Sequence, residues 1–187
     1  MKGITVEIVQ DTDPINPRED AIGCCLGTMV CWHRRYRLGE KHGYEMPSDF
    51  EAEWNNDNAV ILPLYLYDHS GITMRTSPFS CPWDSGQVGV IYVSHEKIIK
   101  EYGALNEDTL KKATDCLVAE VEVYDQYLTG DVYGYVVKKV TQCKGCKDME
   151  AEIVDSCFGF YGDDVKENGM IENIDKKYRK ALEACGK

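Results

Sequence analysis

One apolar stripe in the second half of the chain constrains the fold more than any other feature. Between Asn106 and Gly130, apolar residues recur at steps of three or four, the spacing that places side chains on one face of an α-helix. Asn106 is suited to start a helix and Gly130 to end one, so the pattern predicts one long helix between them. The stripe residues are Leu110, Ala113, Leu117, Val121, Tyr124 and Leu128.

Segments rich in β-branched and aromatic residues predict strands to accompany this helix. Strands are expected at residues 4–10, 59–67, 87–93, 132–138 and 151–161, and further helices at 47–55, 94–102 and 170–184. Because strands and helices do not alternate regularly, the order favours an α+β fold. We expect a single domain over residues 1–187, with an antiparallel or mixed sheet of about five strands and helices packed on one face.

The excess of acidic residues limits the kinds of partner that this chain is expected to bind. The chain has 32 acidic and 21 basic residues, a net charge of −11, which argues against generic binding to bare nucleic acid or anionic lipid. The one dense basic run in the first half of the chain, residues 33–37, is typical of a solvated face or of a site that binds phosphate or an acidic partner. No apolar run reaches the roughly 18–20 residues of a membrane span, and the first residues lack a signal-peptide pattern. We therefore expect a cytoplasmic protein.

The cysteine pattern leaves two interpretations open. Nine cysteines, an odd number, without an export signal indicate reduced thiols. Cys143 and Cys146 form the one Cys-x-x-Cys pair, and zinc binding would need Cys157 and a fourth ligand such as Cys185. The alternative is a turn with two ordinary thiols. We expect no cofactor, with a zinc-stabilised interaction module as an alternative.

Residues 68–86 hold the densest cluster of unusual residues. Long irregular loops in compact domains are often functional. Cys81, His69 and Asp84 supply the residue types of a nucleophilic enzyme site, which makes a small cytosolic enzyme one alternative. The other interpretation is structural, with Trp83 and Phe79 packed over the sheet. Phosphate-binding glycine loops and a Gly-x-Ser-x-Gly elbow are absent from the sequence.

Three stretches together resemble a family of small proteins carried by bacteriophages and other mobile elements. They are YDHSG at 67–71 with FSCPWDSGQVG at 79–89, YDQYLTGDVYGY at 124–135, and DSCFGFYG at 155–162. Some members of this family look like anti-CRISPR proteins that inhibit Cas9-type nucleases. The resemblance implies a non-enzymatic inhibitor that binds such a nuclease or its guide-RNA complex in a bacterial host cell, and it carries over no individual contact residue.

An inhibitor of this kind would present an acidic surface to a positively charged nucleic-acid channel. Since nucleic acid carries regularly spaced charges, a mimic needs carboxylates in rows. An acidic composition that serves only solubility is the alternative, and the apolar stripes leave a homodimer open. The predicted partner-binding residues are Asp68, His69, Trp83 and Asp84 in the loop, Glu120, Glu122 and Asp125 on the polar side of the long helix, and Asp163 and Asp164 after Gly162.

Overall fold

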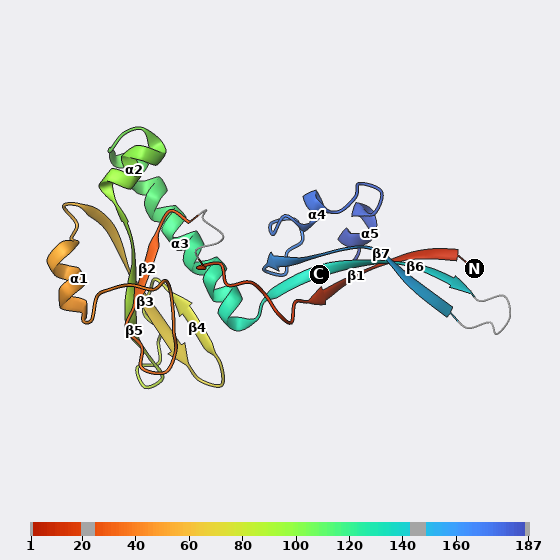
Figure 1. Cartoon of the computed structure of the whole chain (residues 1–187), viewed down its shortest axis with the longest axis horizontal. Coiled ribbons are helices and arrows are strands. Elements are labelled where there is room, and N and C mark those ends of the chain that lie inside the picture. Colours follow the sequence, from red (N-terminus) through yellow and green to blue (C-terminus); the bar gives the residue numbers. More distant parts are fainter. Residues whose placement is uncertain (1, 20–24, 143–148, 186–187) are drawn as a thin grey trace. The chain divides into compact units, whose positions relative to one another are not determined.

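The computed structural model describes residues 2–19, 25–142 and 149–185. The chain divides into two compact units, one built from its two ends, Met1–Ile15 and Gly130–Lys187, and one from Asn16–Thr129. We call them the terminal unit and the central unit. Each has its own antiparallel sheet (Figure 1) and its own buried apolar cluster. The α+β class is thereby confirmed, and the described strands form two sheets where the sequence suggested one.

The elements follow one another in the order labelled in Figure 1. They are β1 (Lys2–Gln10), β2 (Thr28–Cys31), α1 (Pro47–Glu53), β3 (Ala59–Asp68), β4 (Ile72–Arg75), β5 (Ser85–Ser94), α2 (His95–Tyr102), α3 (Glu107–Thr129), β6 (Val132–Gln142), β7 (Met149–Tyr161), α4 (Met170–Asn173) and α5 (Arg179–Glu183).

The terminal unit is a three-stranded sheet in the order β1-β6-β7, with α4 and α5 packed on it. In the register of β1 and β6, Val6 lies opposite Val137, and both side chains are buried. Met170 and Leu182 reach the same cluster from the two helices. The strands and the C-terminal segment therefore share one core.

The sequence predicted one helix over residues 170–184. This prediction is wrong, because the segment forms two short helices, α4 and α5. Ile174 follows α4 with an extended backbone, and the Asp175 carboxylate accepts the backbone N–H of Lys177 at 3.1 Å. An aspartate that bonds the backbone two residues later stabilises a turn in place of a helix. Ile174 and Leu182 still point into one cluster, as the apolar spacing predicted.

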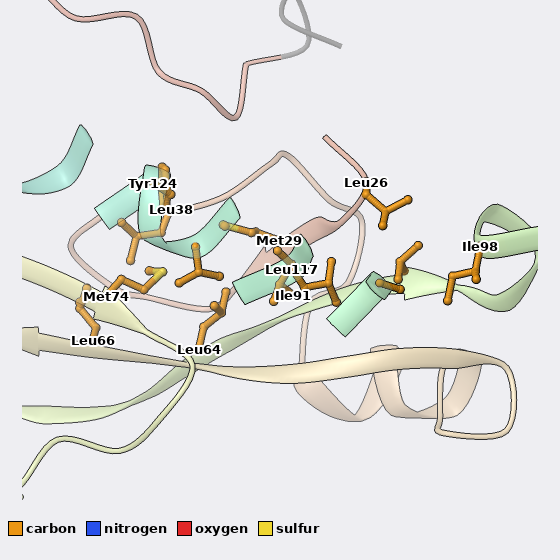
Figure 2. Close-up of a cluster of buried hydrophobic side chains, with 13 residues drawn as sticks. Leu26, Met29, Leu38, Leu64, Leu66, Met74, Ile91, Ile98, Leu117 and Tyr124 are labelled. Atoms are coloured by element: carbon orange, nitrogen blue, oxygen red, sulfur yellow. The ribbon is translucent and has the colours of Figure 1, made fainter. Parts of the chain in front are cut away.

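The central unit is a four-stranded sheet in the order β2-β5-β3-β4, with α3 packed along one face. Leu117 of α3, Ile91 of β5 and Leu64 of β3 are fully buried where these elements meet (Figure 2). Gly27 lies so close to this contact that an added Cβ would come within 2.4 Å of Leu117. Any larger residue there would force the side chains of Leu117 and Ile91 to shift within the core.

The opposite face of this sheet carries an aromatic layer beneath α1. Along β5, Ile91 and Val93 are buried on the α3 side, whereas Tyr92 between them contacts Phe50 and Trp54, with ring centroids 5.0 and 4.9 Å apart. Side chains that follow one another in a strand point to opposite faces. The expected packing of helices on one face thus describes α2 and α3, and α1 lies on the other side (Figure 1).

The long helix α3 begins and ends where its sequence predicts. The Asn106 side chain accepts the backbone N–H of Thr109, and the Thr109 hydroxyl accepts that of Asn106, both at 3.0 Å. These bonds satisfy N–H groups at the helix start. Gly130 ends the helix with a left-handed backbone, φ +74°. Among the described helices, none is both long and apolar enough to cross a membrane.

A buried ion-pair network ties α3 to the loops that precede and follow β2. The Arg18 side chain, 1 % exposed, pairs with Glu40 and with Glu120 of α3, the latter at 2.9 Å. Its guanidinium also donates to the carbonyl of Gly27, and Glu120 accepts the backbone N–H of Leu26. Burial alone would lower the pKa of Arg18, but the two carboxylates more than offset this and raise it. The Arg18 guanidinium therefore stays charged at all ordinary pH values.

The loop after β2 is held at a second point, by Tyr124. The backbone N–H of Gly39 donates to the Tyr124 hydroxyl at 3.0 Å. Burial raises the pKa of Tyr124 to about 12, so the hydroxyl remains protonated across the physiological range. Both attachments position residues 33–37, the basic run, beside the loop that the sequence singled out.

Candidate partner-binding site

Three of the four loop residues predicted from the sequence, Asp68, Trp83 and Asp84, line a surface hollow of about 340 Å³ in the central unit. Three parts of the chain meet there: the basic run, the end of β3, and the loop that leads into β5. We call this feature the Trp83 hollow. Its lining residues are His33, Arg35, Leu66, Asp68, Trp83, Asp84, Ser85, Gly86 and Val88.

Asp84 organises the hollow. One carboxylate oxygen lies 3.4 Å from Nδ1 of His69 and 3.6 Å from Sγ of Cys81. Its backbone carbonyl accepts the N–H of Asp68 at 2.8 Å, which joins the loop to the end of β3. The structure therefore brings together Asp68, His69 and Asp84, three of the residues that the sequence analysis singled out.

The turn between β3 and β4 holds His69 at the edge of this group. The N–H of His69 donates to the carbonyl of Gly71 at 3.0 Å, and Ser70 between them has φ +60°. A left-handed backbone costs a residue with a side chain of the order of 1 kcal/mol, whereas glycine adopts it freely. The turn thus retains strain at Ser70.

We expect Ser70→Gly to raise the free energy of unfolding by about 0.5–1 kcal/mol, because glycine relieves this strain. Urea denaturation followed by tryptophan fluorescence measures the change. Ser80→Gly is the matched control, since Ser80 does not have a positive φ, and it should be neutral or destabilising. Equal effects of the two substitutions would contradict strain at Ser70.

The basic run supplies the opposite wall. Arg35 pairs with the Asp68 carboxylate, and the Tyr36 hydroxyl donates to the same carboxylate at 3.3 Å. His33 stacks on Tyr36 with ring centroids 5.0 Å apart, and its Nδ1 accepts the N–H of Tyr36 at 3.2 Å. Arg35 itself is mostly exposed, so this pair contributes little to stability and its guanidinium remains accessible to a partner.

The loop before Trp83 is braced at its base. The Arg75 guanidinium lies 3.9 Å from the centroid of the Phe79 ring and donates to the carbonyls of Ser77 and Pro78. Phe79 also contacts Tyr67, with centroids 5.5 Å apart. A cation over an aromatic face and two hydrogen bonds hold the loop in one shape.

Trp83 extends from this braced loop into solvent with 91 % of its surface exposed. The structural interpretation, in which Trp83 and Phe79 both pack over the sheet, is wrong for Trp83, although Phe79 does pack against Tyr67. Proteins seldom leave so large an apolar side chain open to water, and exposed indoles are characteristic of binding surfaces. The sequence could indicate that Trp83 is unusual but not which way it points.

The three acids predicted on α3 do not form an exposed row. Glu120 forms an ion pair with Arg18 in the buried network, and 13 % of its side chain is exposed. Asp125 accepts the Thr73 hydroxyl at 2.8 Å and the N–H of Met74 at 2.6 Å, which fastens β4 to the helix. Glu122 is exposed. The interpretation as a row is therefore wrong for two of the three, because backbone and cationic donors hold those carboxylates inside the unit.

The two acids predicted after Gly162 lie in the terminal unit. Asp163 and Asp164 are both exposed. Asp164 accepts the backbone N–H of Lys166 at 2.8 Å and so stabilises its own turn. A contact with a partner at these two residues stays a prediction.

The enzyme interpretation meets a geometric difficulty. In a nucleophilic Cys–His pair the imidazole takes the proton from the thiol, so the two side chains have to be in contact. Here Cys81 and His69 each contact the Asp84 carboxylate, and among the described residues no hydrogen bond joins the thiol to the imidazole. His69 is also largely exposed to water. The arrangement is that of a polar surface cluster.

Two of the four proposed zinc ligands, Cys157 and Cys185, belong to the described residues. Cys143 and Cys146 lie outside the described residues. Cys157 packs at the edge of the terminal core, and the Cys185 thiol contacts the carbonyl of Val6 at 3.1 Å. Within the described residues, no group of three or more His, Cys, Asp or Glu side chains is placed to hold a metal ion.

Comparisons with known proteins add no relative. No protein-family model, curated protein or solved structure matches this chain.

Proposed function

We propose that this chain is a non-enzymatic anti-defence protein that binds a Cas9-type nuclease, or its guide-RNA complex, through the Trp83 hollow. The observation that carries the proposal is the 91 % exposure of Trp83 on a braced loop. Tryptophan in a preformed surface loses little conformational freedom on binding and buries much apolar area, so it commonly anchors interfaces. Asp68, Asp84 and Arg35 around it supply charged groups of both signs to orient a partner.

Two of the sequence stretches that carry the family resemblance line the proposed binding site. The stretches 67–71 and 79–89, separated in the sequence, lie together in the structure and supply most of the lining of the hollow. Their proximity supports a shared role for these two stretches in binding, because bracing the loop does not by itself require both to line one hollow.

Charge supports the choice of a cationic target. The central unit has 18 acidic residues and 10 basic ones, a net charge of −8. A nuclease that holds guide and target in a positively charged channel would attract this unit over long range. Attraction of this kind raises the rate of association and weakens as salt is added.

The direct test mixes the full chain with a Cas9-type nuclease loaded with guide RNA. Co-elution in size-exclusion chromatography and cleavage of target DNA are measured at about 50 mM and about 500 mM salt, which lie on either side of strong screening. The proposal expects co-elution and loss of cleavage at low salt, and weaker association at high salt. Separate elution with full cleavage at low salt would contradict it.

A further inference from the structure

A second surface feature of the central unit lies on the sheet face opposite α3, away from the main core. A groove of about 420 Å³ runs between α1 and the outer face of β5 and β3, and we call it the α1 groove. Its walls and floor are mostly aromatic and aliphatic. The residues that define it are Trp32, Phe50, Glu51, Trp54, Val88 and Val90.

The aromatic walls are fixed before any partner arrives. The indole N–H of Trp32 donates to the backbone carbonyl of Tyr44 at 3.0 Å, and that of Trp54 donates to the Tyr44 hydroxyl at 2.9 Å. Phe50 is 2 % exposed and contacts Trp32 edge to face. A ligand entering the groove would therefore meet two preset, half-buried indoles, at little cost in conformational entropy.

The charge around the groove has one sign. Residues 45–57 contain five acids and no base, and among the described residues lining the groove Glu51 is the one that carries a charge. The Asp49 carboxylate accepts the backbone N–H of Met46, and the Glu53 carboxylate accepts the Tyr44 hydroxyl. Within the described residues, the Glu51 carboxylate has no such hydrogen bond or ion pair, so it is available to a ligand.

We propose that the α1 groove binds an arginine side chain from a basic segment of a partner protein. A guanidinium stacks on indole faces and pairs with a carboxylate, and its three-carbon stem suits an aliphatic floor. Trp32, Trp54 and Glu51 offer these features within one groove. The groove borders the Trp83 hollow, since Val88 lines both, but the inference does not rest on the proposed nuclease target.

The test uses the full chain and an acetylated, amidated Gly/Ser peptide with three spaced arginines. The chain has three tryptophans, so its ¹⁵N–¹H spectrum shows three indole signals, which single Trp→Phe variants assign. We expect the Trp32 and Trp54 signals to shift with the arginine peptide and the Trp83 signal to stay in place. The same peptide with citrulline, which has the shape of arginine without its charge, should cause no shift.

A charge-neutral variant tests whether the Glu51 carboxylate contributes to binding of the peptide. Glu51→Gln should weaken the affinity for the arginine peptide about threefold, which is the size of effect expected for a partly exposed ion pair. Glu107→Gln, at an exposed acid in the first turn of α3, should leave the affinity unchanged. Equal weakening by both variants, equal shifts with citrulline, shifts at all three indoles alike, or no shift at Trp32 and Trp54 would each overturn the proposal. Indole shifts that follow protein concentration without peptide would assign the groove to a second copy of the chain.

Discussion

Arg18→Met is expected to lower the free energy of unfolding of the central unit by about 3–5 kcal/mol, the range found when one partner of a buried ion pair is removed. The substitution leaves the carboxylates of Glu40 and Glu120, which are 20 % and 13 % exposed, without their shared cation. Urea denaturation followed by tryptophan fluorescence measures this unit alone, because Trp32, Trp54 and Trp83 all lie in it.

Two further variants separate the buried network from ordinary surface charge. Lys112→Met breaks an ion pair with Asp108 that is mostly exposed, and it should change stability by less than about 0.5 kcal/mol. Arg18→Met combined with Glu40→Gln and Glu120→Gln should cost less than Arg18→Met alone, because no unpaired charge stays buried. A loss below about 1 kcal/mol for Arg18→Met would show that the network does not hold the loops.

Periodic features of the sequence predicted the structure well. The apolar stripe of α3 has the period of a helix, and its ends carry residues that favour helix termini, so Asn106 and Gly130 mark its limits correctly. The strand at 59–67 is β3 with one added residue. The four-residue strand β4 escaped prediction, because Ile72–Arg75 is too short to show a pattern. Short elements are fixed by neighbours, and β4 depends on β3 and on Asp125 of α3.

Some residues of the candidate site could be predicted from the sequence, whereas others are revealed only by the fold. Asp68, His69 and Asp84 were selected together because they belong to one unusual stretch of sequence, and the structure places them close to one another. Arg35 lies 33 residues before Asp68 in the chain, and only the fold shows that the two are paired. In the sequence, Glu120 resembles a solvated acid. Its position inside the unit depends on Arg18, 102 residues away, which no local pattern reveals.

Trp83→Ala is expected to weaken binding to the guide-loaded nuclease at least about 30-fold, which corresponds to about 2 kcal/mol, the usual threshold for an interface anchor. The indole makes its contribution only when a partner buries it, since 91 % of its surface is exposed in the free chain. The free energy of unfolding should therefore change by less than about 0.5 kcal/mol. Affinity is measured by titration with labelled nuclease, and stability by urea denaturation.

Ile99→Ala is the matched control for this substitution. Ile99 is an exposed apolar residue of α2 in the same unit, with 44 % of its surface open to solvent. It does not line the Trp83 hollow, so its removal should leave affinity unchanged. Comparable losses for Ile99→Ala and Trp83→Ala would indicate non-specific apolar attraction and would count against the hollow as the binding site.

The proposed function requires that the chain acts by occupying its target and does not convert a substrate. Titrating the full chain into a fixed concentration of guide-loaded nuclease, well above the dissociation constant, tests this most directly. Residual DNA cleavage should fall in a straight line and reach its minimum near one chain per nuclease. Complete inhibition at a small fraction of one equivalent, deepening with time of incubation, would show turnover and contradict the account.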